Sequence, residues 1–121
     1  MKLREFYNEI GGNYDEVIGR LMNEKRIYKY LFKFQNNDDY ENMTASLENE
    51  NWEDAFRFSH NLKGMGLNLG LGAMADAAVD VCEALRNGKP EKDISDMLSR
   101  LKKKYDSTLQ AIGTLNADDA E

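Results

Sequence analysis

The sequence contains only one cysteine, one proline and one histidine in 121 residues. The single Cys82 cannot form an internal disulfide, which favours a reducing compartment, so we expect a cytoplasmic protein. One histidine and one cysteine also fall short of the three or four ligands that a zinc site requires. We therefore expect no metal centre, and no cofactor bound by this chain.

Long apolar segments are absent as well. No run approaches the roughly 20 residues that cross a bilayer, and residues 1–5 lack the uninterrupted apolar segment of a signal peptide. The 22 acidic and 16 basic residues give a net charge of −6. This acidity disfavours nucleic acid and anionic membranes as partners.

Apolar residues recur with helical spacing along the whole chain, and no alternating β-branched stretch indicates a strand. The pattern predicts helices over residues 3–10, 14–22, 24–35, 39–49, 52–69, 73–87 and 91–112. Pro90, two residues after Gly88, is typical of a helix end. Without a strand there is no strand-linked glycine-rich phosphate loop, so we do not expect the chain to phosphorylate itself from ATP.

The chain is long enough for one domain with its own core. Short loops make successive long helices antiparallel. We therefore expect an all-α fold, an antiparallel up-down four-helix bundle with the short N-terminal helices packed across it as a lid. This single helical domain covers residues 1–115, and residues 116–121 are expected to be a disordered acidic tail. A monomer is the expected state, with a dimer through Tyr28 and Phe32 as the alternative.

The single histidine, His60, lies in the middle of a predicted amphipathic helix. The apolar residues around it have the spacing of one buried stripe: Phe58, Leu62, Met65 and Leu69. At about 100° per residue, His60 lies roughly 200° from both Phe58 and Leu62. The imidazole is therefore predicted to face outward, on a side of the helix that also carries Lys63 and Gly64 at i+3 and i+4.

Residues 55–64 (AFRFSHNLKG), followed by Leu69-Gly70 and a second amphipathic helix, resemble the core of a histidine-containing phosphotransfer domain. The family motif His-x-x-Lys-Gly is met by His60, Lys63 and Gly64. The resemblance covers nearly the whole chain. It implies that His60 is the phospho-acceptor of a two-component phosphorelay.

The resemblance also implies the partners and the chemistry. His60 would accept a phosphoryl group from a receiver-domain aspartate and pass it to another receiver. The partners would be receiver domains of hybrid histidine kinases and response regulators, with Mg²⁺ expected on the receiver. The chain would be a stoichiometric carrier without kinase activity of its own, and hence no enzyme in the usual sense.

Lys63 and Gly64 have separate expected roles beside the imidazole. The Lys63 ammonium is expected to meet the phosphoryl oxygens, the alternative being an ordinary surface lysine. A glycine within a helix costs about 1 kcal/mol relative to alanine. Gly64 is expected to clear room for the phosphoryl group and the partner; the alternative, close helix packing, fits Gly66 better.

Two apolar residues lie within about 40° of His60 in helical projection, namely Phe56 at i−4 and Leu67 at i+7. They are predicted to form a docking patch for a receiver, unless the N-terminal helices cover one of them. Arg57, at i−3, either steers the acidic receiver pocket or is a plain surface charge.

Cys82 is a departure from similar domains, which often place a polar residue about 22 positions after the histidine to orient its ring. A thiol is a weak hydrogen-bonding group, so Glu83 is the alternative candidate and Cys82 is expected in the core. Two other functions remain open. The fold could serve as a phosphate-independent receiver-binding adaptor, or as a purely structural module, although the costly Gly64 disfavours the adaptor.

Overall fold

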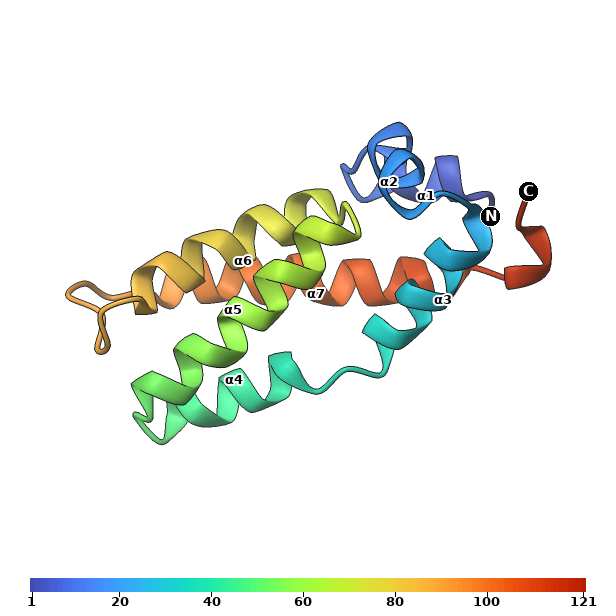
Figure 1. Cartoon of the computed structure of the whole chain (residues 1–121). Coiled ribbons are helices and arrows are strands. Elements are labelled where there is room, and N and C mark those ends of the chain that lie inside the picture. Colours follow the sequence, from blue (N-terminus) through green and yellow to red (C-terminus); the bar gives the residue numbers. More distant parts are fainter.

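A computed structural model describes residues 1–121, and every regular element in it is helical (Figure 1). The elements are α1 (Leu3–Glu9), α2 (Tyr14–Leu21), α3 (Glu24–Gln35), α4 (Asp39–Glu48), α5 (Trp52–Asn68), α6 (Gly72–Leu85), α7 (Ser95–Ile112) and the short 3-10 helix η1 (Ala117–Asp119). The prediction of an all-α fold is confirmed. None of the helices is both long enough and apolar enough to cross a membrane.

The last long helix begins later than predicted, at Ser95 rather than near residue 91. Pro90 leads into an irregular segment, and the Asp93 carboxylate accepts a hydrogen bond from the Ser95 backbone N–H at 2.8 Å. An aspartate that satisfies a free N–H at the first turn is a common way to start a helix. The apolar spacing of the segment does not reveal this delay.

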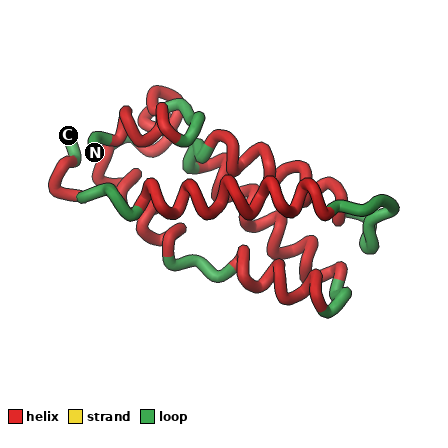
Figure 2. Tube along the Cα trace, turned by 180° about the vertical axis from the view of Figure 1, so that it is seen from behind, coloured by secondary structure: helices red, strands yellow, loops and turns green.

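The four consecutive helices α4 to α7 lie side by side and form the larger part of the molecule (Figure 2). α5 packs against both α4 and α6, and α6 packs against α7. Tyr40 of α4 stacks on Tyr105 of α7 with 4.2 Å between ring centroids, which joins the first and last helices of this set. The core between them includes the buried side chains of Met43, Leu62 and Leu101.

The short helices differ in position from the expected lid across the bundle. α1 and α2 lie at the end of the long helices where α5 turns into α6, and α3 packs against α7 (Figure 1). At this end Gly70 has φ +63°, and a Cβ there would collide with Val17 of α2. The Tyr7 hydroxyl of α1 donates to the Leu69 carbonyl at 2.8 Å. The glycine turn lets the backbones approach closely, which directs the early helices to this end.

Residues 116–121 also differ from the expected disordered tail. They form η1 and return to α3, so both chain termini lie at the same end of the molecule (Figure 1). The buried Glu24 carboxylate accepts hydrogen bonds from the Tyr14 hydroxyl at 2.6 Å and from the Glu121 backbone N–H at 2.8 Å. These bonds give the acidic tail a defined conformation that its composition does not predict.

Candidate functional site

Helix α5 carries the candidate site. Asn51 precedes it as the N-cap and accepts a hydrogen bond from the Asp54 backbone N–H at 3.3 Å. The helix then continues for 17 residues without a break. His60 lies near its middle and is exposed. The outward orientation predicted from the helical phase is therefore what the structure has.

The buried side of α5 is wider than the predicted stripe. Leu62 and Leu69 are buried as expected, whereas Phe58 and Met65 are only half-buried. The remaining contacts are made by small residues that a pattern of large apolar side chains misses: Ala55, Ser59 and Gly66. A Cβ on Gly66 would lie 3.2 Å from Ala75 of α6, so this glycine serves close helix packing, the alternative raised for Gly64.

Open space lies beside the imidazole. A Cβ built on Gly64 would have no atom of another residue within 4 Å, so packing does not explain this glycine. A shallow depression surrounds it, lined by Asp39, His60, Asn61, Gly64, Met65 and Asn68. Asp39 comes from the start of α4 and accepts a hydrogen bond from the Asn61 side chain at 3.3 Å. Asp39 was not identified from the sequence, because only the packing of α4 on α5 brings it here.

The imidazole of His60 makes no hydrogen bond with another residue. Its nearest aromatic neighbour is Phe56, one helical turn earlier, with 6.0 Å between ring centroids. Cys82 is fully buried in the core, as expected for that residue. The Glu83 carboxylate is held by the Arg86 guanidinium through two hydrogen bonds, so it does not orient the ring either.

Lys63 is half-buried next to α6. The pKa of the Glu83 carboxyl is lowered first by its hydrogen bond to Arg86, and further by the charges of Arg86 and Lys63. Lys63 therefore lies near this pair, although it forms no salt bridge itself. The Lys63 ammonium is thus not paired with a carboxylate.

The three residues predicted to bind a partner all have exposed surface. Leu67 is 49% exposed, and Arg57 is exposed while pairing with Asp54 at 3.4 Å. Phe56 is half-buried, and the guanidinium of Arg86, which follows the last residue of α6, lies over its ring at 5.7 Å. The N-terminal helices do not bury Leu67, although Arg20 of α2 donates one hydrogen bond to its carbonyl oxygen at 3.0 Å.

Arg20 was not identified from the sequence as part of this region. Its guanidinium also donates to the Asn68 carbonyl at 2.9 and 3.1 Å, so it occupies free carbonyls at the C-terminal end of α5. A cation is also favoured there by the helix dipole. No local sequence pattern indicates this contact, since 48 positions separate Arg20 from Asn68.

This geometry presents a single exposed imidazole with free space on one side and a lysine one turn away. No cluster of three or more histidine, cysteine, aspartate or glutamate side chains could hold a metal ion. The family model of the Hpt domain matches residues 30–112, well over half of the chain.

The chain belongs to the Hpt family. Hpt domains are phosphocarrier modules of two-component phosphorelays, without kinase activity, and they interact with receiver-type partners. The matched range includes α4 to α7 completely, whereas α1, α2 and the first half of α3 lie outside it. No match was found among curated proteins or among solved structures.

Proposed function

We propose that His60 is the phospho-acceptor of this Hpt domain, and that α4 to α7 form the antiparallel four-helix bundle that displays it. The domain takes a phosphoryl group from the aspartate of one receiver domain and passes it to the aspartate of another. The observation that carries this proposal is the exposed imidazole beside the open space at Gly64. The proposed setting is the cytoplasm, with the chain acting as a monomer.

The transfer needs little from the chain itself. The unprotonated ring nitrogen of His60 attacks phosphorus, the bond from phosphorus to the aspartate oxygen breaks, and the carboxylate leaves with the bonding electrons. The proton on the other ring nitrogen stays on the ring or passes to solvent. Delivery to a second receiver is the same step reversed. The acyl phosphate is already activated, and Mg²⁺ on the receiver neutralises charge in the transition state.

Three features of α5 support this role. Lys63 lies one turn after His60, where its ammonium attracts the phosphoryl oxygens. Gly64 leaves room for the phosphoryl group and for the receiver loop that carries it. Phe56, Arg57 and Leu67 provide the contact surface around the imidazole, with an apolar residue on each side along the helix.

A phosphate-independent adaptor of the same fold is the second candidate. It would keep the receiver-binding surface but make no use of His60. The mid-helix Gly64 disfavours it, because a glycine that touches nothing lowers helix stability without improving packing. An adaptor has no need of the space that this glycine leaves.

The test uses a receiver domain charged with labelled acetyl phosphate and then mixed with wild type or His60→Gln. Label is expected on the wild type alone, and it should be lost in acid, as phosphohistidine is. Equal labelling of both proteins would exclude His60 as the acceptor. Binding without labelling of either protein would favour the adaptor, and neither binding nor labelling would favour a structural module.

A further inference from the structure

Helix α3 carries a concentration of positive charge in an otherwise acidic chain. Its exposed residues include Lys25, Arg26, Lys29 and Lys33, in a protein of net charge −6. The one carboxylate of the helix, Glu24, is buried and bonded to Tyr14. At about 100° per residue, the four cations fall within one broad stripe of the helix surface.

None of these four cations forms a salt bridge. Arg26 is the only arginine of the chain without a carboxylate within 4.0 Å; each of the other five is paired. Lys29 is four residues from both Lys25 and Lys33, and like charges at this spacing destabilise a helix. The cluster therefore contributes no ion pair to the stability of this fold.

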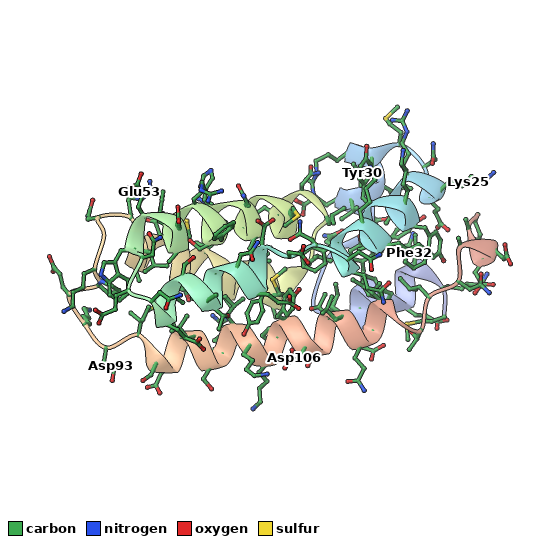
Figure 3. All side chains as sticks on the ribbon, turned by 90° about the horizontal axis from the view of Figure 1, so that it is seen from below. Lys25, Tyr30, Phe32, Glu53, Asp93 and Asp106 are labelled. Carbon is green, nitrogen blue, oxygen red and sulfur yellow. The ribbon has the colours of Figure 1, made fainter.

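An exposed tyrosine lies among these cations. Tyr30 is 39% exposed, and the ammonium groups of Lys29 and Lys33 lie 5.9 and 5.6 Å from its ring centroid. Figure 3 shows Lys25 and Tyr30 projecting from the same part of the surface. Tyrosine and arginine are enriched at protein interfaces, and Arg26 lies on the same helix as Tyr30.

Tyr30, at the edge of this stripe, faces the same side of the molecule as His60. In Figure 3, Tyr30 and Glu53 project toward one side, opposite to Asp93 and Asp106. Glu53 and His60 are seven residues apart on α5, about two full turns, so their side chains point the same way. Tyr30 and the imidazole are therefore accessible from one direction.

The separation between the two regions is compatible with a single partner. Lys33 precedes Asp39 by six residues, and Asp39 lines the depression beside His60. Six residues span at most about 22 Å. A typical interface covers about 800 Å² on each partner, a patch about 30 Å across. One interface of this size can therefore include both Asp39 and Lys33.

We propose that the basic face of α3, formed by Lys25, Arg26, Lys29, Tyr30 and Lys33, docks the acidic rim of the receiver domain that exchanges phosphate with His60. This inference rests on the proposed function. A receiver must hold Mg²⁺ next to its aspartyl phosphate, and Mg²⁺ is held by carboxylates, so the rim of its site is acidic. Complementary charge on α3 steers that rim toward the imidazole.

The test measures binding apart from transfer, using the full chain with His60→Gln and a panel of purified receiver domains. Lys25→Glu, Lys29→Glu and Lys33→Glu are combined in one variant. The matched control reverses three exposed lysines elsewhere that also lack salt bridges: Lys89→Glu, Lys92→Glu and Lys103→Glu. Both variants have the same net charge, and circular dichroism checks that each keeps its helix content.

The α3 variant is expected to raise the receiver Kd about tenfold at low salt relative to the control, with the difference shrinking as salt screens the charges. Equal Kd values for the two variants would overturn the proposal. So would α3-dependent binding to phosphatidylserine vesicles or α3-dependent self-association in place of receiver binding. If the receiver binds through α3 but leaves wild-type His60 unlabelled, the proposed function fails and the docking surface stands.

Discussion

The ring of Phe56 lies 6.0 Å from the imidazole of His60, centroid to centroid, with 32° between the two planes. The Arg86 guanidinium also lies over the Phe56 ring, 5.7 Å from its centroid, and Glu83 holds that guanidinium through two hydrogen bonds. Because the imidazole makes no hydrogen bond with another residue, this aromatic contact is a principal restriction on the ring. We therefore expect Phe56 to orient the His60 ring, in addition to its proposed role as a surface for a partner.

Replacing Phe56 with leucine tests this relationship. The His60 ring protons should shift in the NMR spectrum, because the ring current of Phe56 is lost while an apolar side chain remains. Phosphotransfer should slow several-fold, with a loss of about 1 kcal/mol in the free energy of unfolding. Phe56→Tyr, which keeps the ring, should restore both signals. Unchanged His60 resonances in the leucine variant would show that the contact with Phe56 does not determine the orientation of the imidazole ring.

Gly64→Ala should separate stability from function. Its Cβ meets no other residue, so the substitution should raise the free energy of unfolding by up to about 1 kcal/mol. The same methyl group occupies the space next to His60 and should slow phosphotransfer. Thermal unfolding measures the expected gain in stability, and phosphotransfer rates of the same variant measure the expected loss of function.

Gly66→Ala is the control for that substitution. Its Cβ would lie 3.2 Å from Ala75, so no gain in stability is expected although the helix and the residue change are the same. A Gly64→Ala protein that transfers phosphate at the wild-type rate would contradict the proposed role of that glycine.

Lys63→Ala should slow phosphotransfer about tenfold and leave the fold intact. The ammonium is proposed to stabilise phosphoryl oxygens, an interaction worth about 1–2 kcal/mol when charge-assisted. Circular dichroism tests whether the fold is intact, and transfer rates test whether phosphotransfer is slower. Lys103→Ala, at an exposed site on α7, should change neither. Equal rates for the two alanine variants would make Lys63 an ordinary surface lysine.

Gly70→Ala should destabilise the protein by about 2–3 kcal/mol, because φ is +63° and the new methyl group would collide with Val17. Gly19→Ala, in a spacious position on α2, should instead be neutral or stabilising. Urea unfolding of both variants measures the difference. A tolerated Gly70→Ala would mean that α1 and α2 are not held against the α5–α6 turn as the structure has them.

Stability should also fall at alkaline pH. Burial is the main cause that raises the pKa of Tyr105 to about 12, from an ordinary value of 10.0. The raised pKa contributes stability that is complete below pH 10 and is lost as pH rises toward about 12, because the unfolded chain releases this proton first. Urea unfolding at several pH values should show a shallower decline for Tyr105→Phe. Identical pH slopes for the two proteins would contradict this assignment.

Local patterns in the sequence were sufficient for much of the candidate site. The period of the apolar residues on α5 predicted the outward direction of His60, and the same helix carries Lys63 and Gly64 at fixed angles to it. These relationships depend only on the geometry of one helix, which the backbone hydrogen bonds impose on any sequence that forms it. Most helix bounds also followed from signals within a few residues, although the start of α7 at Ser95 did not.

The rest was decided by contacts between helices. Asp39 reaches the depression beside His60 only because α4 packs against α5. Arg86 lies over Phe56 only because α6 also packs against α5. Arg20 caps α5 from 48 positions away. Such contacts join residues that are distant in the chain, and helical periodicity carries no information about which partner a buried face will meet. The sequence by itself therefore determined that His60 faces outward from its helix, and the tertiary structure determined which side chains surround it.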